Sequence, residues 1–325
     1  MKTRNALSLL VLFALAAIPA LAKDDALSLV PGNAVTVGVV KLSDMRTSPL
    51  SGVLFQHTDK FSADGDGAKF IAEAGLDPAH DVDRIVVATT PRTALGNEAD
   101  ILVVAEGRFN PERLANALVA RGAVRKDGYL LAPKHENGDD DNGPGAVAFP
   151  SSKLVIAGTE RAVVAALAAR EAGGTGFPGT SAFGPQISRI DSNATAWAVI
   201  DVTRAQRLTG SPSVPGNNGA NQPLALAIKT LSTVALWATD TGDSLKLGAF
   251  GVSSDAETLQ LLEDTVRGAL SALRLAVKDK SPELVPVLRR FDVSRTDDTI
   301  KITGSIPAAT IKDLIAKKKA GVASH

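Results

Sequence analysis

Residues 234–252 read Val-Ala-Leu-Trp-Ala-Thr-Asp-Thr-Gly-Asp-Ser-Leu-Lys-Leu-Gly-Ala-Phe-Gly-Val. The two apolar runs in this stretch have the composition of β-strands, and the polar residues Asp240 to Asp243 between them form a turn pattern. A helix start follows at Ser254-Asp-Ala-Glu257, where Ser254 and Glu257 have the spacing of a capping box. The stretch therefore predicts a β-hairpin that leads directly into a helix.

The predicted helix, residues 255–277, has apolar residues three or four positions apart, which places them on one face. These are Leu259, Leu262, Val266, Leu270, Leu273 and Val277. A face of this kind packs a helix on its own sheet. A coiled-coil partner is the alternative, and three heptads are the lower limit for one.

The same order of elements occurs in the first half of the chain. Strand patterns at 85–90 and 101–107 predict a hairpin, and Asn110-Pro-Glu112 predicts a helix with Asn110 as its cap and Pro111 at its first position. A helix cap is also predicted at Ser43-Asp44, after the first strand.

The two halves share one plan. Each begins with a strand, at 34–42 or 194–200, and each ends with two strands and a helix after the hairpin and its helix. The plan is β-α-β-β-α-β-β-α, and it predicts an α+β fold of antiparallel sheets with helices on one face. We predict two tandem, duplicated α+β units at 23–180 and 181–325.

The first 22 residues have the three parts of a secretory signal peptide. Lys2 and Arg4 give a positive start, residues 6–18 are apolar, and Ala20-Leu-Ala22 supplies the small residues of a cleavage site. At about 1.5 Å per residue the apolar run is too short for a membrane core of about 30 Å. We predict cleavage after Ala22 and a bacterial protein that is periplasmic or secreted, with no membrane span in the mature chain.

Composition argues against several classes of function. Lys and Arg total 35, as do Asp and Glu, so loss of Lys2 and Arg4 leaves a mature net charge of −2. Binding of nucleic acid needs clustered basic residues, so no nucleic-acid partner is predicted. The one basic cluster, at 312–319, lies at the end of a predicted helix, where cations offset the helix dipole. The chain has no cysteine, so it has no disulfide and no thiol chemistry.

No catalytic or cofactor motif is present, so we predict no catalytic, cofactor-binding or metal-ligating residue and no cofactor. Gly174, Gly176 and Gly179 match a dinucleotide-binding spacing, but they follow a predicted helix instead of a strand and are interpreted as a helix stop. The histidines are scattered. The acidic loop 133–145, which contains His135, is interpreted as a solvated hairpin loop.

A calcium loop is the sharpest metal hypothesis. Residues 62–73 can be aligned on the twelve-residue loop with Asp64, Asp66 and Glu73 at positions 3, 5 and 12. Ser62 stands where an Asp is required and Lys69 where an apolar residue is required. A polar turn before a helix explains the segment better, and a calcium-stabilised module remains an alternative.

A resemblance adds to this picture. The phrase Gly75-Leu-Asp-Pro-Ala-His-Asp-Val-Asp-Arg-Ile85, a strand, and then Glu106-Gly-Arg-Phe109 resemble exported bacterial proteins of unknown function. The resemblance implies a signal peptide followed by an α+β body. Its motifs are turns and strand edges, so it implies no site residue, ligand or reaction.

The sequence favours an exported, non-catalytic protein that binds a protein or a small-molecule ligand or has a structural role in the cell envelope or outside it. A glycosidase-like hydrolase is the alternative, because paired Asp and Glu side chains cannot be recognised from spacing. Two carboxylates about 5–10 Å apart in a cleft would favour that alternative.

Overall fold

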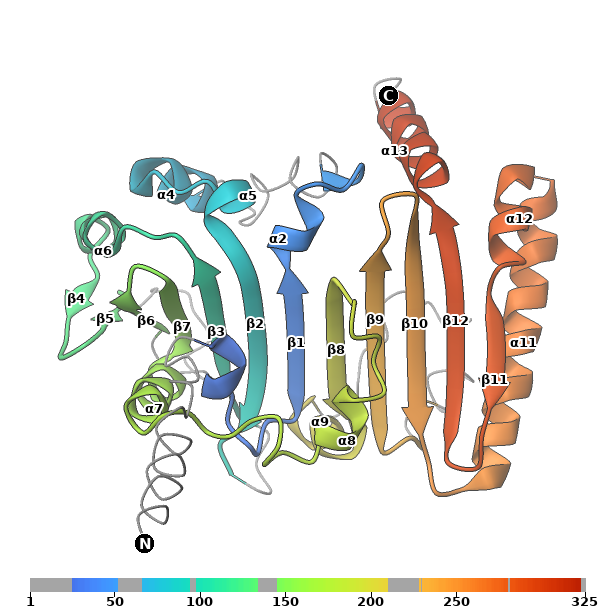
Figure 1. Ribbon diagram of the computed structural model, residues 1–325, viewed down its shortest axis with the longest axis horizontal. Coiled ribbons are helices and arrows are strands. Elements are labelled where there is room, and N and C mark those ends of the chain that lie inside the picture. Colours follow the sequence, from blue (N-terminus) through green and yellow to red (C-terminus); the bar gives the residue numbers. More distant parts are fainter. Residues whose placement is uncertain are drawn as a thin grey trace, which may run out of the picture.

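The computed structural model describes residues 25–51, 66–93, 98–133, 145–209, 228, 230–279 and 281–322. Its centre is one antiparallel sheet of 12 strands in the order β11-β12-β10-β9-β8-β1-β2-β3-β7-β6-β5-β4 (Figure 1). The predicted α+β class with antiparallel strands is confirmed. The predicted signal peptide, residues 1–22, lies outside the described residues.

The elements of the first half follow the predicted order of strand, hairpin, helix, strands and helix. They are η1 (Ala26–Leu29), β1 (Thr36–Lys41), α2 (Leu42–Met45), α4 (Asp66–Ala74), α5 (Pro78–Asp81), β2 (Val82–Pro91), β3 (Ala99–Gly107), α6 (Pro111–Ala120), β4 (Val124–Arg125), β5 (Leu130–Leu131), β6 (Gly145–Ser151), β7 (Leu154–Thr159) and α7 (Glu160–Glu171).

The elements of the second half repeat that order. They are α8 (Gly184–Ile187), β8 (Ala196–Asp201), α9 (Val202–Thr209), β9 (Thr233–Asp240), β10 (Ser244–Val252), α11 (Ala256–Lys278), η4 (Pro282–Leu284), α12 (Val285–Leu288), β11 (Asp292–Arg295), β12 (Thr299–Pro307) and α13 (Ala308–Val322).

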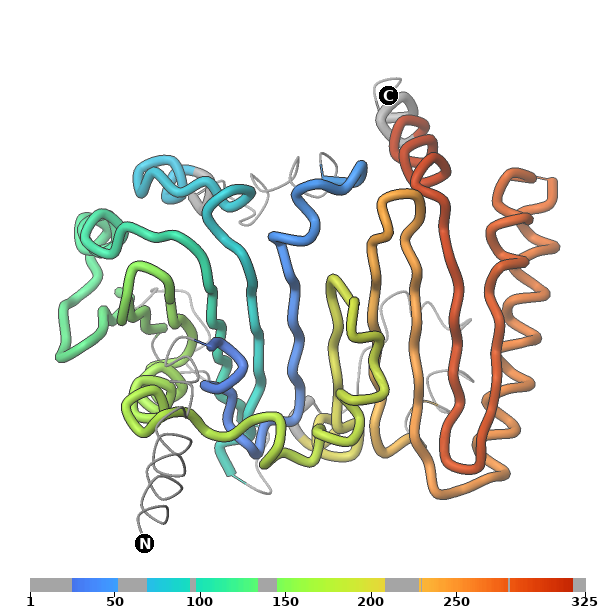
Figure 2. Tube along the Cα trace, viewed as in Figure 1, coloured from blue at the N-terminus to red at the C-terminus, as the bar shows by residue number. Residues whose placement is uncertain are grey.

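The first strands of the two halves, β1 and β8, are hydrogen-bonded neighbours at the middle of the sheet (Figure 2). Outward from this pair the strands run β1-β2-β3-β7-β6 on one side and β8-β9-β10-β12-β11 on the other, which is the same order within each half. The two predicted units therefore share one sheet. The strand order is what a duplication would give, and the duplication itself stays a prediction.

The front face of the sheet, toward the viewer in Figure 1, is the face on which η1 lies. Val37 and Val39 of β1 are on this face, because they share a core cluster with Leu29 of η1. Its core continues from β7, with Ile156, across the centre to β10, with Phe250. η1 and α7 cover this face in the first half. The segment between the halves also packs here through residues that include Phe183, so it is part of the core and not an extended linker.

The opposite, back face is also covered. In the first half it packs against α4 and α6, through a cluster that includes Leu114 of α6 and Ile85 of β2. In the second half it packs against α11, through a cluster that includes Leu259. The expectation of helices on one face is therefore wrong. Strands such as β2 are apolar on both sides, and each side needs a cover.

The helix starts were predicted with mixed success. Asn110 caps α6, and its side chain accepts a hydrogen bond from the backbone N of Arg113 at 3.0 Å, as predicted. In α11 the cap is Asp255 instead of Ser254, and Asp255 accepts from the backbone N of Glu257 at 3.0 Å. The carboxylate has two acceptor atoms, so it also accepts from the Thr258 hydroxyl at 2.6 Å. The predicted cap at Ser43-Asp44 is wrong as well, because both residues lie inside α2.

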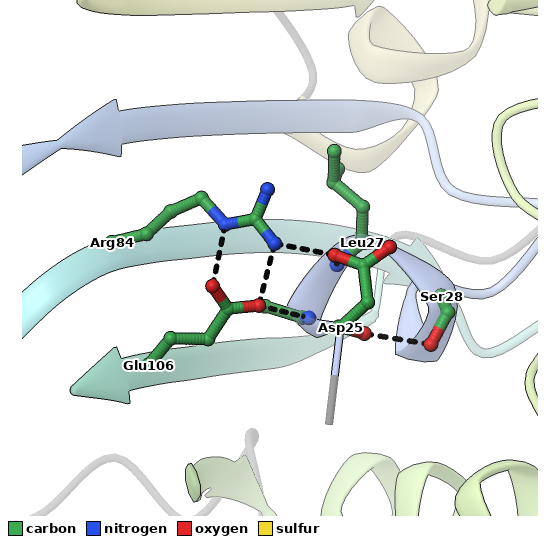
Figure 3. A network of polar contacts seen from close by, with 6 residues as sticks. Asp25, Leu27, Ser28, Arg84 and Glu106 are labelled. Atoms are coloured by element: carbon green, nitrogen blue, oxygen red, sulfur yellow. Dashed lines mark hydrogen bonds and ion pairs between the residues drawn. The ribbon is translucent and has the colours of Figure 1, made fainter. Parts of the chain in front are cut away.

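An ion cluster fixes the start of the described chain to the front face (Figure 3). Arg84 of β2 lies between Glu106 of β3 and Asp25, which precedes η1, and its Nε donates to Glu106 at 2.8 Å. Burial opposes the charge of this guanidinium, but the hydrogen bonds and charges of Glu106 and Asp25 outweigh that effect and raise the pKa of Arg84. Glu106 also accepts from the backbone N of Ala26.

Candidate functional site

An apolar cavity of about 320 Å³ lies between α11 and the back face of the second half of the sheet. This volume is at the lower end of the range for small-molecule sites, about 300–1,000 Å³. Its walls come from α11, from the strands β9, β10 and β12, and from the segment that precedes β9. The lining residues are Ile228, Leu231, Val234, Leu236, Ala249, Phe250, Gly251, Leu262, Val266, Ala269, Leu270, Leu273, Ile300 and Ile302.

The cavity exists because α11 and the sheet are in close contact at one end only. Leu259 and Leu262, in the first turns of α11, are fully buried against the sheet. Val266 and Leu270 further along are only partly buried, and Leu273 is 46% exposed. The apolar stripe of the helix thus continues beyond the point where it touches the strands.

Small residues on the floor keep the space open. Ala249 and Gly251 of β10 face α11, and neither fills the volume that a Leu or Ile would occupy. A Cβ atom added at Gly251 would lie 2.5 Å from a methyl of Leu231, so the close approach of Leu231 depends on glycine here. Leu236 of β9, 48% exposed, forms part of the rim.

Polar contacts hold α11 in place from outside the cavity. Glu263 accepts hydrogen bonds from Arg267 at 2.9 Å and from Arg295 of β11 at 3.1 Å, and these bonds lower the pKa of its carboxyl. Further along, Arg274 donates to the backbone O of Leu288 in α12 at 2.9 Å. These contacts join α11 to the β11 side, so the position of the helix over the strands does not depend on a ligand.

The chemistry available inside the cavity is purely apolar. All fourteen lining residues are aliphatic, aromatic or glycine, so no acid, base or nucleophile among the described side chains lines it. A ligand here would be held by burial of its own apolar surface and by close packing. Neither orientation by hydrogen bonds nor proton transfer is available to it within these walls.

The structure describes only the second part of the hypothetical calcium loop, from Asp66 onward. Ser62 and Asp64 lie outside the described residues, and Asp66 begins α4, so positions 5 to 12 of the proposed loop are already helical. Glu73 forms an ion pair with Arg121 at 2.9 Å. Within the described ranges no group of three His, Asp or Glu side chains could hold a metal ion. The calcium alternative stays a prediction.

Of the four histidines in the chain, only His80 is among the described residues. His57 and His135 are outside the described residues, with the acidic loop that contains His135. His80 is exposed and its Nδ1 lies 2.7 Å from Asp77, whose pKa this contact lowers. Of the helices that the structure describes, none combines the length and apolar character needed to span a bilayer.

Sequence reasoning identified the apolar face of α11 but not the cavity beneath it. The pattern at 255–277 correctly predicted packing on the helix's own sheet. The sequence feature that could have revealed the cavity is the pair of small residues Ala249 and Gly251 on β10. These two residues face α11, and their small size leaves space between the helix and the strands. That feature becomes visible only once the facing strand is known.

Comparisons with known proteins give a fold and no function. No family model and no curated protein matches the chain. The solved structure of the Treponema protein TP0453 in crystal form III is similar, with a TM-score of 0.50 and 12% identity over 90% of this chain and 98% of that one. Crystal form I has a TM-score of 0.49 and 9% identity, over 90% and 97%. At these identities the likeness concerns the α+β fold alone.

Proposed function

We propose that this chain is an exported, non-catalytic binding protein whose ligand is an apolar small molecule or hydrocarbon chain. The observation that supports this most is the cavity under α11, which has a ligand-sized volume and only apolar walls. Burial of apolar surface contributes roughly 25 cal/mol per Å², so such a cavity gains free energy by accepting a hydrocarbon.

Export is part of the proposal. The order of positive residues, apolar run and small residues in positions 1–22 supports it. An apolar molecule outside the cytoplasm is poorly soluble in water, and a protein cavity shields it. The apolar lining argues for an uncharged ligand portion.

A neutral fluorescent probe tests binding in the cavity. N-phenyl-1-naphthylamine should bind the protein at one saturable site and be displaced by straight-chain alcohols. Each added methylene is worth ~0.8 kcal/mol, so competitor affinity should rise about fourfold per methylene until the cavity is full. Affinity that does not depend on chain length would contradict an apolar cavity as the site.

A matched pair of variants locates the probe. Ala249→Leu places a larger side chain on the cavity floor and should weaken probe binding by about tenfold or more, because it adds three carbon atoms and removes the space of roughly three methylenes. Ala276→Leu makes the same change on α11 at an exposed position that does not line the cavity, and it should leave affinity unchanged. Circular dichroism checks that both variants fold. Equal affinities for folded Ala249→Leu and wild type would place the probe elsewhere.

A further inference from the structure

A second hollow, of about 490 Å³, lies on the opposite side of the sheet, at β9, β10 and β12. Four cationic residues line it, each from a different part of the chain: Arg189, Lys246, Arg290 and Lys301. These residues are far apart in the sequence but line the same hollow. Arg189 follows α8, Arg290 precedes β11, and the two lysines belong to β10 and β12. In Figure 1 no helix lies in front of β10 and β12.

The strand register brings these groups together. Phe250 of β10 is on the front face. Lys301 is on the same face because it is opposite Phe250, and Lys246 is on it because it lies four residues from Phe250 on β10. Trp237 is on the same face, opposite Gly248. A Cβ atom at Gly248 would lie 2.1 Å from the indole ring, so the ring rests directly on the glycine backbone.

Trp237 therefore forms an aromatic part of the lining, next to the cation of Lys301. It is 9% exposed, and Lys301 Nζ lies 5.6 Å from the centre of its ring. Thr303 and Ser305 of β12 add hydroxyl groups to the lining. The hollow thus combines positive charge, hydrogen-bond donors and the small exposed part of an indole ring.

The positive charges of the hollow are only partly balanced: four cationic residues face one carboxylate, Asp191, whose pKa is lowered by its hydrogen bonds and by the charge of Lys246. Asp191 is the one carboxylate in the lining, and it accepts hydrogen bonds from Thr239 at 3.0 Å and from the backbone N of Asn193 at 2.9 Å. Arg189 is paired with Asp298 at 3.2 Å. Within the described residues, Lys246, Arg290 and Lys301 form no ion pair. Like charges that line one hollow repel each other, and an anion between them would relieve that repulsion.

We propose that this hollow binds a small organic anion, a phosphate or carboxylate group whose carbon skeleton lies on Trp237. Lys246, Arg290 and Lys301 supply charge-assisted hydrogen bonds to the anionic group, and Thr303 and Ser305 supply neutral ones. The exposed part of the indole ring gives the carbon skeleton of the ligand an apolar contact. The hollow and the cavity under α11 lie on opposite faces, so this inference does not rest on the proposed function.

Calorimetry with three small probes tests the proposal. Phenyl phosphate offers the anion and the ring, inorganic phosphate the anion alone, and phenol the ring alone. Phenyl phosphate should bind best, with a stoichiometry of one, and its affinity should fall as salt is raised. Binding should also change the fluorescence of Trp237, and a Trp197→Phe background removes the signal of the other tryptophan.

Charge variants decide where the probe binds. The double variant Lys246→Gln with Lys301→Gln should lose about tenfold or more in affinity for phenyl phosphate. Lys153→Gln, on an exposed turn of the first half, removes one charge elsewhere and should bind as wild type. No saturable binding to wild type, or the same affinity in all three folded proteins, overturns the proposal.

Vesicles distinguish the two sources of an anionic group. Vesicles of phosphatidylglycerol that bind wild type, release it on addition of phenyl phosphate and fail to bind the double variant assign the site to a lipid headgroup. Phenyl phosphate that binds while these vesicles do not assigns it to a free anion. Phosphatidylcholine vesicles serve as the control without net charge.

Discussion

Arg84 forms the polar link between the chain's first described segment and the sheet. It binds Glu106 through two nitrogens and also contacts Asp25. Glu106→Gln keeps the shape of the side chain but leaves the partly buried guanidinium without its main countercharge. A hydrogen bond to a charged group contributes ~1.5–3 kcal/mol, so we expect a loss of about 2 kcal/mol in the free energy of unfolding, measured by urea denaturation.

The neighbouring pair of Arg92 and Glu98 provides the control for this prediction. Its ion pair at 2.9 Å has similar geometry, but the Glu98 side chain is 57% exposed against 21% for Glu106. Exposed pairs contribute ~0–1 kcal/mol, so Glu98→Gln should change stability little. Equal losses in the two variants would mean that burial of the Arg84 cluster has no energetic role.

At the scale of elements, the start of α11 makes stability depend on pH. Hydrogen bonds from the Thr258 hydroxyl, above all, and from the first backbone N–H groups lower the pKa of Asp255 in the folded state. A carboxyl group with a lowered folded pKa stabilises the protein above its unfolded pKa of about 3.9, and that contribution is lost as pH falls below it. Asp255→Asn should therefore flatten the fall in stability between about pH 5 and pH 2.

Denaturant midpoints measured across that pH range check the expectation. Asn still accepts a backbone hydrogen bond, so the helix start is retained at neutral pH while the titration disappears. Gln260→Asn, at an exposed position of the same helix, introduces the same side chain without removing a carboxyl group and serves as the control, which should keep the acid profile of wild type. If the stability of Asp255→Asn depended on pH as that of wild type does, the carboxyl group of Asp255 would not be the cause of the loss of stability in acid.

At the scale of the whole molecule, the two halves should unfold together. β1 and β8 pair at the centre, and one core cluster extends from Ile156 in the first half to Phe250 in the second. Both tryptophans belong to the second half, so their fluorescence reports that half alone, whereas far-ultraviolet circular dichroism reports both. Ile156→Val, at a fully buried position of β7, should cost about 1 kcal/mol and shift both signals by the same amount.

A tryptophan transition that stays in place while the dichroism transition moves would contradict this cooperativity. Chains longer than about 150 residues commonly unfold in more than one step, so coincident signals would be informative. Such a result would favour a single folding unit. The boundary near residue 180 would then be a feature of sequence pattern and not of stability.

Local sequence determined much of the fold because its signals lie within a few residues of each other. Two apolar runs separated by a polar turn predicted the hairpin at β9 and β10, and an Asn-Pro pair predicted the start of α6. Caps and turns satisfy backbone groups from neighbouring positions, so they can be recognised without knowing the rest of the chain. Even there a shift of one residue occurred, because Ser254 and Asp255 can both cap and only geometry selects Asp255.

Only the tertiary structure decided that the two halves share one sheet and where the two hollows lie. Nothing in the pattern of β1 or β8 specifies that they pair, since an edge of either strand could also have remained free. The cavity under α11 is the space that the side chains of the helix and of the facing strands leave unfilled. Its volume depends on both elements, so no single stretch of sequence determines it. Trp237, Lys246 and Lys301 come from three strands, and they share one hollow because register sets which side chains face the same way.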